Sequence, residues 1–563
     1  MITENSKKAN VYSTANGFPY LHHPYGAMYS KPNGSLLLRD AHLIESLAHF
    51  DRERTPERVV HAKGGGCRFE FELTDSLSDL TIAAPYQEVG YKCPGIVRFS
   101  TVGGETASPD TARDPRGVSW KFYTKWGNHD WVFNNTPVFF IRDPNKFPHF
   151  IHTQKRFPQN NLGQSFDTSM YWDYLTQNLE SIHQITYMFG DRGTPASWGE
   201  MNSYSGHTFK FVNKDGIFTY VQYHILADAG FKTLSNEEAA KLAGESPDYN
   251  QASLFTDLNN GKHPTYTCYI QTMTSEQAAN FKYSINDLTK VWPHKDFPLR
   301  RFGKITLTEN VGNYFSEIEQ VAFSPSNTCI PGIDPSNDPV LQSRLFSYQD
   351  TQRHRLGTNY QQLPVNRPNN LVCPFTGKSY AGECPFNAVN FQKNGPMCFD
   401  NYGSNSNYIS SFDRNIEFIS NPCDIVREKS SNPSHSLFEG IVLDEQTKKH
   451  VEDEICVRLK QQAVIESKID EVFYVSGVSQ LDLEQPRRLY EKVYNEEDKK
   501  TFVKNVVSHA SRISKEYIKV RVAQYFGLLN QDLGKAIAEG LNVEWEPITF
   551  GKYVESIGLV ETI

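Results

Sequence analysis

Apolar and polar residues alternate in several short stretches between residues 58 and 310. The clearest of them are residues 69–73, 95–102 and 117–124, which repeat with the period of two that is typical of β-strands. Asn-Lys-Asp-Gly at 213–216 separates two further stretches, and Asp-Gly favours a hairpin turn because it tolerates positive φ. So many aromatic, alternating strands predict a closed antiparallel β-barrel with a filled interior.

The period changes to that of a helix at two places. Residues from about 165 to 190 interrupt the strands and are predicted to form a helical insert, and the chain is predicted to be helical again from about residue 431. There, Asn495 is predicted to cap one helix and Pro486 to open another, each with a stripe of apolar residues. Such stripes indicate a packed core rather than a cofactor site.

Two long segments show neither the period of a strand nor that of a helix. Residues 1–55 are polar and suggest an extended arm, and residues 311–430 are rich in Pro, Asn, Ser and Gly. Loops of that length are unusual in a free-standing domain, so we expect residues 311–430 to wrap a partner subunit. The predicted class is α+β, with four parts: an arm (1–55), an antiparallel barrel (56–310), a wrapping connection (311–430) and a helical C-terminal domain (431–563).

The composition narrows the class of protein. The 563 residues are 38% hydrophobic and 13% aromatic, which is enough for a large core. A net charge of −8 and a pI near 6.1 argue against nucleic acid or a membrane as partner. Nine cysteines without CxxC spacing favour a reduced compartment, and the ending Val-Glu-Thr-Ile is not of the SKL type that directs proteins to peroxisomes. We therefore expect a cytoplasmic protein.

Residues 338–357 carry the signals for both ends of one helix. Asp338 is predicted to cap its first turn, and Pro339 fits the first helical position. Gly357 can adopt a positive φ after the last turn. This segment is therefore predicted to be the one clear helix between residues 311 and 430.

Three residues of this helix, Arg344, Tyr348 and Arg355, fall on a single face. A guanidinium one turn away favours the ionised form of the Tyr348 phenol. A phenolate on a rigid helix is a hard anionic ligand for ferric iron, and Arg355 is placed to hold a carboxylate, so the pattern suggests haem. Tyr and Arg at helical spacing more often form a surface pair, so the helix alone leaves both interpretations open.

Two other residues, His61 and Asn134, differ chemically from their surroundings. His61 follows two valines and precedes the glycines at 64–66. A lone histidine in such a setting is usually a core residue, and the glycines are compatible with a plain turn. Asn134 interrupts an otherwise apolar strand, where a buried amide costs a few kcal/mol unless it is hydrogen-bonded. Asn134 therefore has either a structural partner or a ligand.

Five stretches together resemble one family, and they occur in that family's order. They read RERTPERVVHAKGGG from residue 52, GIVRFSTVGGETASPDTARDPRG from 95, WVFNNTPVFFIRDP from 131, VWPHKDFPL from 291 and RLFSYQDTQRHRLG from 344. The chain resembles the haem catalases of the small-subunit, monofunctional type, and is closest to a cytosolic type found in budding yeasts. Catalase is the standard example of tyrosine-ligated haem.

The resemblance implies a homotetramer with one haem b per subunit, which converts hydrogen peroxide to water and dioxygen. At the matching positions, His61 and Asn134 would act on the distal side of the haem, and Tyr348 would be the axial iron ligand. Ser100 would fix the His61 tautomer, and Arg344 would pair with the phenolate. Three arginines would meet the haem propionates: Arg58, Arg98 and Arg355. Four residues would lie at the haem face or along the substrate channel: Val60, Asp114, Phe139 and Phe147.

The resemblance also implies a possible NADPH site on the outside of the barrel. Its matching positions are His183, Arg192, Trp292 and His294. Arg192 would bind the 2′-phosphate through its planar fork. However, a basic residue common in that site is Leu226 here, and a usual serine is Gly190. We therefore expect weak or substoichiometric NADPH binding that catalysis does not require.

Three other functions use parts of the same pattern. A haem peroxidase or monooxygenase of organic substrates uses a Tyr–Arg helix too, but a small-peroxide channel gated by Val60 and Phe147 argues against it. A haem carrier has no need of His61 and Asn134, and a haem-free barrel leaves Tyr348 unexplained. An absorption spectrum together with dioxygen release from peroxide would distinguish these functions.

Overall fold

The computed structural model describes residues 10–329, 331–369, 394–399, 408 and 476–558. The chain divides into two compact units, residues 1–57 and residues 58–563. The first unit contains the helix α1 (Ala41–Phe50), where the sequence predicted only an extended arm. The Asp40 side chain caps α1 by accepting a hydrogen bond from the backbone N–H of Leu43. All features below belong to the second unit.

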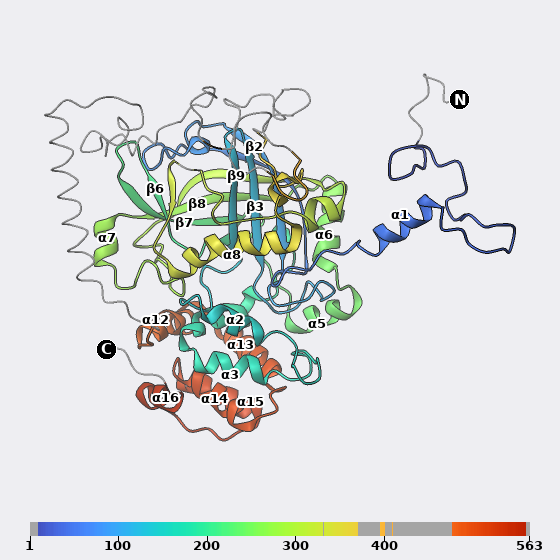
Figure 1. Cartoon of the computed structure of the whole chain (residues 1–563). Coiled ribbons are helices and arrows are strands. Elements are labelled where there is room, and N and C mark those ends of the chain that lie inside the picture. The colour runs from blue at the N-terminus through green and yellow to red at the C-terminus, as the bar shows by residue number, and fades with distance from the viewer. Residues whose placement is uncertain (1–9, 330, 370–393, 400–407, 409–475, 559–563) are drawn as a thin grey trace, which may run out of the picture. The chain divides into compact units, whose positions relative to one another are not determined.

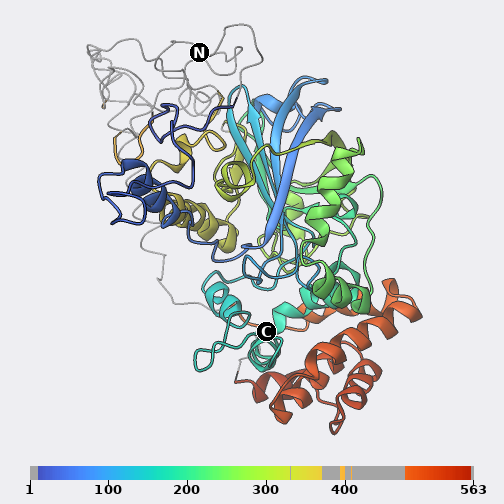
Figure 2. The same cartoon turned by 90° about the vertical axis from the view of Figure 1, so that its right-hand side faces the viewer.

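Eight antiparallel strands close into a barrel, which Figures 1 and 2 show from two sides. In ring order they are β1 (Gly64–Leu73), β2 (Lys92–Ser100), β3 (Gly117–Thr124), β4 (Gly127–Asn134), β5 (Ser203–Tyr204), β7 (Phe218–Ala227), β8 (Thr265–Met273) and β9 (Arg300–Asn310). Two more strands, β6 (Phe209–Val212) and β10 (Ile333–Pro335), extend the sheet beside β7. The predicted fold class is confirmed.

Alternation along each strand separates the interior of the barrel from its outer face. Val97 and Phe99 of β2 belong to the buried interior cluster, as do Trp131 and Phe133 of β4. Trp131 stacks on Phe133 with ring centroids 5.6 Å apart, so aromatic rings fill the interior. The residues between them along these strands lie on the outer face: Arg98, Ser100, Val132 and Asn134. This outer face carries the candidate site.

Two turn predictions have different outcomes. The hairpin between β6 and β7 is confirmed: Asn213 accepts hydrogen bonds from two backbone N–H groups of the turn, and Gly216 has φ +76°. The glycines at 64–66 do not form a turn, because they are the first residues of β1. A Cβ on Gly66 would lie 2.0 Å from the carbonyl oxygen of Val97, so β1 approaches β2 too closely for a side chain there.

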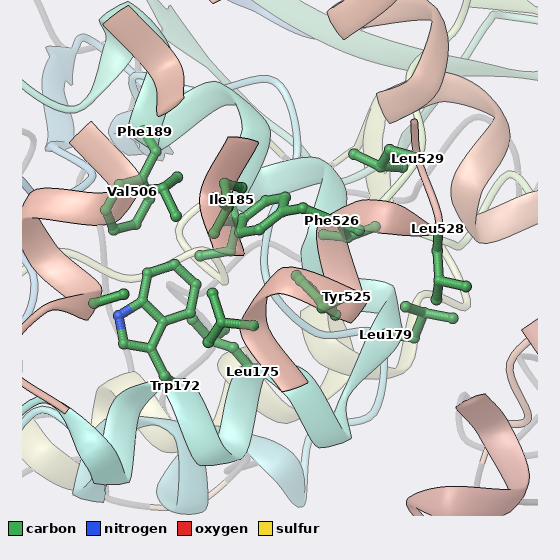
Figure 3. Close-up of a cluster of buried hydrophobic side chains, with 14 of the residues drawn as sticks. Trp172, Leu175, Leu179, Ile185, Phe189, Val506, Tyr525, Phe526, Leu528 and Leu529 are labelled. Carbon is green, nitrogen blue, oxygen red and sulfur yellow. The ribbon is translucent and has the colours of Figure 1, made fainter. Parts of the chain in front are cut away.

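Helices from two distant parts of the chain form a second core, shown in Figure 3. The predicted insert is confirmed as α3 (Ser169–Gln177), η2 (Leu179–Ser181), α4 (Ile182–Tyr187) and η3 (Met188–Arg192). The C-terminal partners are α12 (Leu481–Arg488), η7 (Leu489–Val493), α13 (Glu496–Ala510), α14 (Glu516–Gly527), α15 (Gln531–Leu541) and α16 (Phe550–Ser556). Trp172 of α3 meets Phe526 of α14 edge to face, with centroids 6.1 Å apart.

Shorter helices and turns complete the second unit. They are η1 (Ala84–Tyr86), α2 (Lys146–His152), η4 (Trp198–Glu200), α5 (Asn236–Glu245), α6 (Tyr249–Asn259), α7 (Ser275–Asn280), η5 (Phe315–Glu319) and η6 (Tyr360–Gln362). Helix α8 (Pro339–Leu356) is described with the site. Within the described ranges, no helix combines the length and the apolar character that a membrane span requires.

The two predicted starts of C-terminal helices have different outcomes. Asn495 caps α13 as predicted, because its side chain accepts hydrogen bonds from the first turn. The prediction for Pro486 is wrong, because Pro486 lies inside α12 and does not open it. The first turn of α12 forms ahead of the proline, where buried ion pairs with Arg142 and Lys290 hold Asp482.

Buried histidines are expected to make the folded chain sensitive to acid. Burial lowers the pKa of His129 from 6.5 to about 4 and that of His509 to about 3. Between pH 6.5 and 4 the unfolded chain therefore binds protons that the folded chain does not, so stability is lost as the pH falls through this window. Each histidine contributes a slope of up to about 1.4 kcal/mol per pH unit. Denaturant titrations measure this slope, and His509→Gln should reduce it by that amount; an unchanged slope would contradict the assignment.

Candidate active site

Three residues on neighbouring strands form one row on the outer face of the barrel. The register pairs Gly117 of β3 with Ser100 of β2 on one side and with Asn134 of β4 on the other. A Cβ on Gly117 would lie 2.5 Å from Nδ1 of His61, so the imidazole lies directly over this glycine. Nδ1 of His61 is also 2.9 Å from Oγ of Ser100. The row therefore brings His61, Ser100 and Asn134 together.

The backbone of His61 adopts a conformation that is rare for a residue with a side chain, with φ +62°. Its N–H donates to the carbonyl of Val102 at 2.9 Å, and its carbonyl accepts from Nη1 of Arg98 at 2.8 Å. Burial, followed by the positive charges of Arg98 and Arg344, lowers the pKa of His61 to about 3. The imidazole is therefore neutral at physiological pH and held in one position.

Gly117→Ala is expected to lower turnover roughly 100-fold, because the added methyl group pushes the imidazole of His61 aside and misplaces it by about an ångström. Haem content should not change. Gly244→Ala is the matched control, since a Cβ on this glycine of α5 meets no atom within 4 Å. Oxygen-electrode assays on both variants measure the effect. Wild-type turnover by the Gly117 variant would show that the position of His61 is not critical.

Two adjacent asparagines at the end of β4 have opposite surroundings. Asn135 is buried and satisfied: its Oδ1 accepts from the backbone N–H of Arg116 at 2.7 Å, and its Nδ2 donates to the carbonyl of Arg192 at 2.8 Å. The half-buried side chain of Asn134 forms no hydrogen bond with any described residue. Of the two alternatives that the sequence left open for Asn134, the geometry favours a ligand.

This contrast predicts different effects for the two alanine variants. Asn134→Ala should lower turnover roughly 10- to 100-fold and leave the denaturation midpoint unchanged, because only a hydrogen bond to substrate is lost. Asn135→Ala should lower stability by roughly 1–3 kcal/mol for each backbone group that it leaves unsatisfied. Denaturant titration and peroxide turnover are measured on both. A destabilised but fully active Asn134 variant would contradict the assignment.

Helix α8 lies against the outside of the barrel wall (Figures 1 and 2), and both of its predicted ends are confirmed. Oδ1 of Asp338 accepts from the backbone N–H groups of Val340 and Leu341, and Gly357 has φ +97°. Oδ2 of Asp338 is 2.5 Å from Nδ1 of the buried His207, which follows β5. The cap therefore also fixes the start of α8 to the barrel.

The side chain of Arg344 joins the phenol of Tyr348 to the barrel. One guanidinium nitrogen, Nη2, donates to the hydroxyl of Tyr348 and to the carbonyl of Val132 in β4, each at 2.9 Å. The Arg–Tyr pair that the sequence predicted is thus formed, and it is half buried rather than on the surface. A guanidinium in this position stabilises negative charge on the phenol oxygen.

Three buried guanidinium groups lie close together beside this helix, those of Arg58, Arg98 and Arg355. The only carboxylate among the described residues that pairs with them is Glu319, 3.5 Å from Arg58 and 3.4 Å from Arg355. Burial and mutual repulsion lower the pKa of Arg58, and burial lowers that of Arg98 and brings that of Arg355 to about 10. Two positive charges thus remain uncompensated, and Nη1 of Arg58 and Nε of Arg98 are buried without a hydrogen-bond partner.

The predicted channel residues lie where the barrel meets the helical core. Val60, Phe139 and Phe147 are half buried against that core, and the rings of Phe139 and Phe147 are parallel within 26° at 6.4 Å. Oδ2 of Asp114 accepts from the N–H groups of Val102 and Gly103, at 2.6 and 2.8 Å. Because Val102 also binds the N–H of His61, Asp114 steadies the backbone that positions the imidazole. Burial raises the pKa of Asp114.

Of the four predicted nucleotide-binding residues, three line one cavity of about 200 Å³ outside the barrel: Arg192, Trp292 and His294. His183 is not in that lining; it is buried, and its Nδ1 is 2.8 Å from the carbonyl of Thr289. At Gly190, the space for a side chain is taken by the hydroxyl of Tyr494, 2.0 Å from an added Cβ. That hydroxyl donates to the carbonyl of Thr186 at 2.7 Å.

Sequence reasoning missed three residues of these sites. Gly117 shows a partial signal, a glycine that opens an alternating strand, but its importance depends on the pairing of three strands. Glu319 shows no signal, because nothing in its neighbourhood predicts an approach to Arg58 and Arg355. His224 lines the outer cavity, and its place on the polar side of an alternating strand was a usable signal.

Comparison with known proteins agrees with this geometry. The family model described as Catalase matches residues 13–415, and a second model, described as Catalase-related immune-responsive, matches residues 480–541. The chain belongs to the catalase family. It is a haem catalase, an enzyme that decomposes hydrogen peroxide.

Individual relatives match between 73% and 98% of the chain. Catalase T of Saccharomyces cerevisiae is 65% identical over 557 residues, which are 98% of this chain and 98% of its own. The peroxisomal catalase of Candida albicans is 56% identical over 73% of this chain and 81% of its own. A crystal structure of a fungal catalase, 43% identical, superimposes with a TM-score of 0.80 over 96% of this chain and 98% of its own. Catalase A from Saccharomyces cerevisiae, 41% identical, gives the same score over 94% and 99%.

Proposed function

We propose that haem b is held by Tyr348 as the axial ligand and by Arg58, Arg98 and Arg355 as partners of its propionates. The observation that carries this proposal is the buried arginine cluster with two uncompensated positive charges and two buried donors that form no hydrogen bond, one of which, Nη1 of Arg58, has only the 3.5 Å ion pair with Glu319. A group that brings two carboxylates matches both features, because a buried cation is stable only when it is paired and hydrogen-bonded.

When bound, haem iron supplies the redox chemistry that cleaves one peroxide and oxidises another to dioxygen. His61, neutral because its pKa is about 3, takes the proton from one peroxide oxygen and returns it to the other, which leaves as water. Ser100 keeps the imidazole in place through Nδ1. Asn134 donates a hydrogen bond that orients the peroxide without adding charge. Val60 and Phe147 keep larger donors out of the site.

The sharpest test of this proposal concerns the two carboxylates of the cofactor. The chain is produced in haem-deficient cells and supplied with haem b or with its dimethyl ester, which has the same iron and ring but no carboxylates. Haem b should occupy every chain, and the ester should bind at least about 100-fold more weakly, because each charged hydrogen bond contributes roughly 1.5–3 kcal/mol. Equal affinity for haem b and for the ester would contradict the proposed role of the arginines.

We also propose a cytoplasmic homotetramer in which residues 311–430 wrap a neighbouring subunit, with the four parts of the chain divided as the sequence predicts. Phe346 on α8 is 75% exposed, a large apolar surface that a second copy would cover. Residues 370–393, 400–407 and 409–475 lie outside the described residues. The five described cysteines are free thiols, which suits a reduced compartment. Light scattering would give the number of 64.2 kDa subunits in the assembly, and imaging of a fluorescent fusion would give the compartment.

For NADPH, we propose weak binding at the outer cavity. Arg192 contributes a guanidinium for the 2′-phosphate, and Trp292 and His294 contribute ring surfaces. Leu226 adds no charge, and the hydroxyl of Tyr494 fills the space beside Gly190. Catalysis at His61 does not depend on this cavity. One tightly held NADPH per isolated subunit would contradict this proposal.

A further inference from the structure

A buried cluster of four charged side chains joins α12 to two irregular segments of the barrel region. Arg142 lies between β4 and α2, Asp287 and Lys290 lie between α7 and β9, and Asp482 comes from the first turn of α12. Asp482 is only 4% exposed, and it pairs with Arg142 at 2.6 Å and with Lys290 at 2.7 Å. Within this cluster two cations and two anions balance one another, although Asp482 is 340 residues from Arg142 along the chain.

The guanidinium of Arg142 is the centre of the cluster. Its Nη1 lies 2.6 Å from Oδ1 of Asp482 and 3.2 Å from Oδ2 of Asp287, and its Nη2 lies 3.2 Å from Oδ2 of Asp482. Nη2 also donates to the carbonyl of Gly477 at 2.5 Å. Because Asp482 receives both arms of the planar fork, it fixes the orientation of the guanidinium as well as its position. Burial alone would raise the pKa of Asp482, but Lys290 and Arg142 lower it, so the carboxylate stays charged.

Two further contacts connect the same parts of the chain. The backbone N–H of Val291 donates to Oε1 of Gln485 in α12, and Nε2 of Gln485 donates to the carbonyl of Val291, each at 3.0 Å. Just ahead of α12, the hydroxyl of Ser476 donates to Oδ1 of Asp143 at 2.8 Å. Residues 142–143 and 290–291 are therefore both held by the start of the C-terminal helical region.

The segment of Arg142 also carries the two aromatic rings assigned to the channel. Phe139 lies three residues before Arg142 and Phe147 five residues after it, and residues 140–145 belong to no strand or helix. The backbone N–H of Phe139 donates to the carbonyl of Leu288 at 2.9 Å, in the second segment that the cluster holds. The position of these rings therefore depends on the ion cluster and not on a strand ladder.

We propose that Asp482 is a positioning residue for the substrate channel, on which it acts through Arg142 and the segment that carries Phe139 and Phe147. The inference rests on the proposed channel and names the part of the chain that sets its width. Loss of Asp482 leaves a buried cation uncompensated and frees the guanidinium to move. The consequence is a change in which molecules enter, while proton transfer at His61 continues. A cluster that served stability alone would leave entry unchanged.

Ligand association with the ferric haem of the purified enzyme measures entry without turnover. Stopped-flow absorbance at one fixed pH gives the association rates of hydrogen cyanide, a molecule about as small as peroxide, and of imidazole, a ring. Asp482→Asn keeps the shape of the side chain and removes its charge. The imidazole rate relative to the cyanide rate should rise roughly tenfold, the lower end of the 10- to 200-fold by which a fitted pocket discriminates one methylene group. Because His61 is untouched, kcat for hydrogen peroxide should stay near the wild-type value.

Two further variants separate position from stability. Arg142→Lys keeps the buried charge but loses the fork, so the ratio of rates should rise by less than in Asp482→Asn. Leu533→Ala removes a buried side chain of α15, which packs against α13 and α14, and lowers stability while all four charged residues remain. Its ratio should equal that of the wild type. A wild-type ratio in both Asp482→Asn and Arg142→Lys, or an equal rise in Leu533→Ala, would overturn the role of Asp482.

Haem per chain, measured first on each preparation, separates this inference from the proposed function. A wild-type chain that binds no haem would overturn the proposed site and the role of Asp482 with it. Full haem occupancy with unchanged entry in both cluster variants would overturn the role of Asp482 alone. If Asp482→Asn does not accumulate as a folded protein, the ratio in Arg142→Lys decides between these outcomes.

Discussion

His61→Ala is expected to lose nearly all dioxygen release, roughly 10⁴-fold, while it keeps a full complement of haem. The loss follows because the only other side chain over Gly117 among the nearest described atoms is the hydroxyl of Ser100, which is too weak a base at neutral pH to carry the proton between the two peroxide oxygens. Haem should remain because the substitution removes only the imidazole: Tyr348 is on α8, and the bond that Arg98 donates to residue 61 goes to its backbone carbonyl. An oxygen electrode measures dioxygen release, and haem absorbance per chain measures haem content.

Ser100→Ala is the graded control for this variant. It removes the 2.9 Å contact that holds Nδ1 but leaves the imidazole, so turnover should fall between that of the wild type and that of His61→Ala. Substantial dioxygen release by His61→Ala, or a Ser100 variant less active than the His61 variant, would contradict the proposed proton transfer.

Tyr348→Phe is expected to lose haem or to bind it with an altered spectrum, because a phenyl ring has no lone pair for iron. Arg344→Leu should have a smaller effect in the same direction, since it removes the 2.9 Å hydrogen bond to the phenol oxygen but keeps that oxygen. Haem per chain and the absorption spectrum are measured on both. Full occupancy with an unchanged spectrum in Tyr348→Phe would show that another residue is the ligand.

The parts of the site that were predictable depend on local chemistry. Both ends of α8 are encoded within a few residues, by the carboxylate of Asp338 and by Gly357, and the helical repeat alone places Arg344 and Tyr348 one turn apart. In the same way, alternation within β2 and β4 is enough to separate Asn134 from the aromatic interior. Such signals do not require knowledge of the rest of the fold.

The row of Ser100, Gly117 and Asn134 was not predictable in this way, because it depends on the register of three strands. A shift of one residue would turn each side chain to the other face. Nothing in a single sequence measures that register. Glu319 was not predictable for a related reason, because its partners, Arg58 and Arg355, come from distant parts of the chain.

Pro486 shows the opposite error, a local signal overridden by tertiary contacts. A proline favours the first helical position, but here the buried ion pairs of Asp482 with Arg142 and Lys290 begin α12 earlier. Inside α12 the proline has no N–H to donate, so the helix tolerates the loss of one backbone hydrogen bond there.

The dioxygen yield of the purified, haem-containing chain tests the central claim most directly. Peroxide is added without any organic donor, and dioxygen is counted against the peroxide consumed. If His61, Asn134 and Tyr348 have their proposed roles, the chain should release one dioxygen for every two peroxides consumed. Organic donors should not increase its turnover. Consumption of peroxide that requires an organic donor and releases no dioxygen would contradict the account.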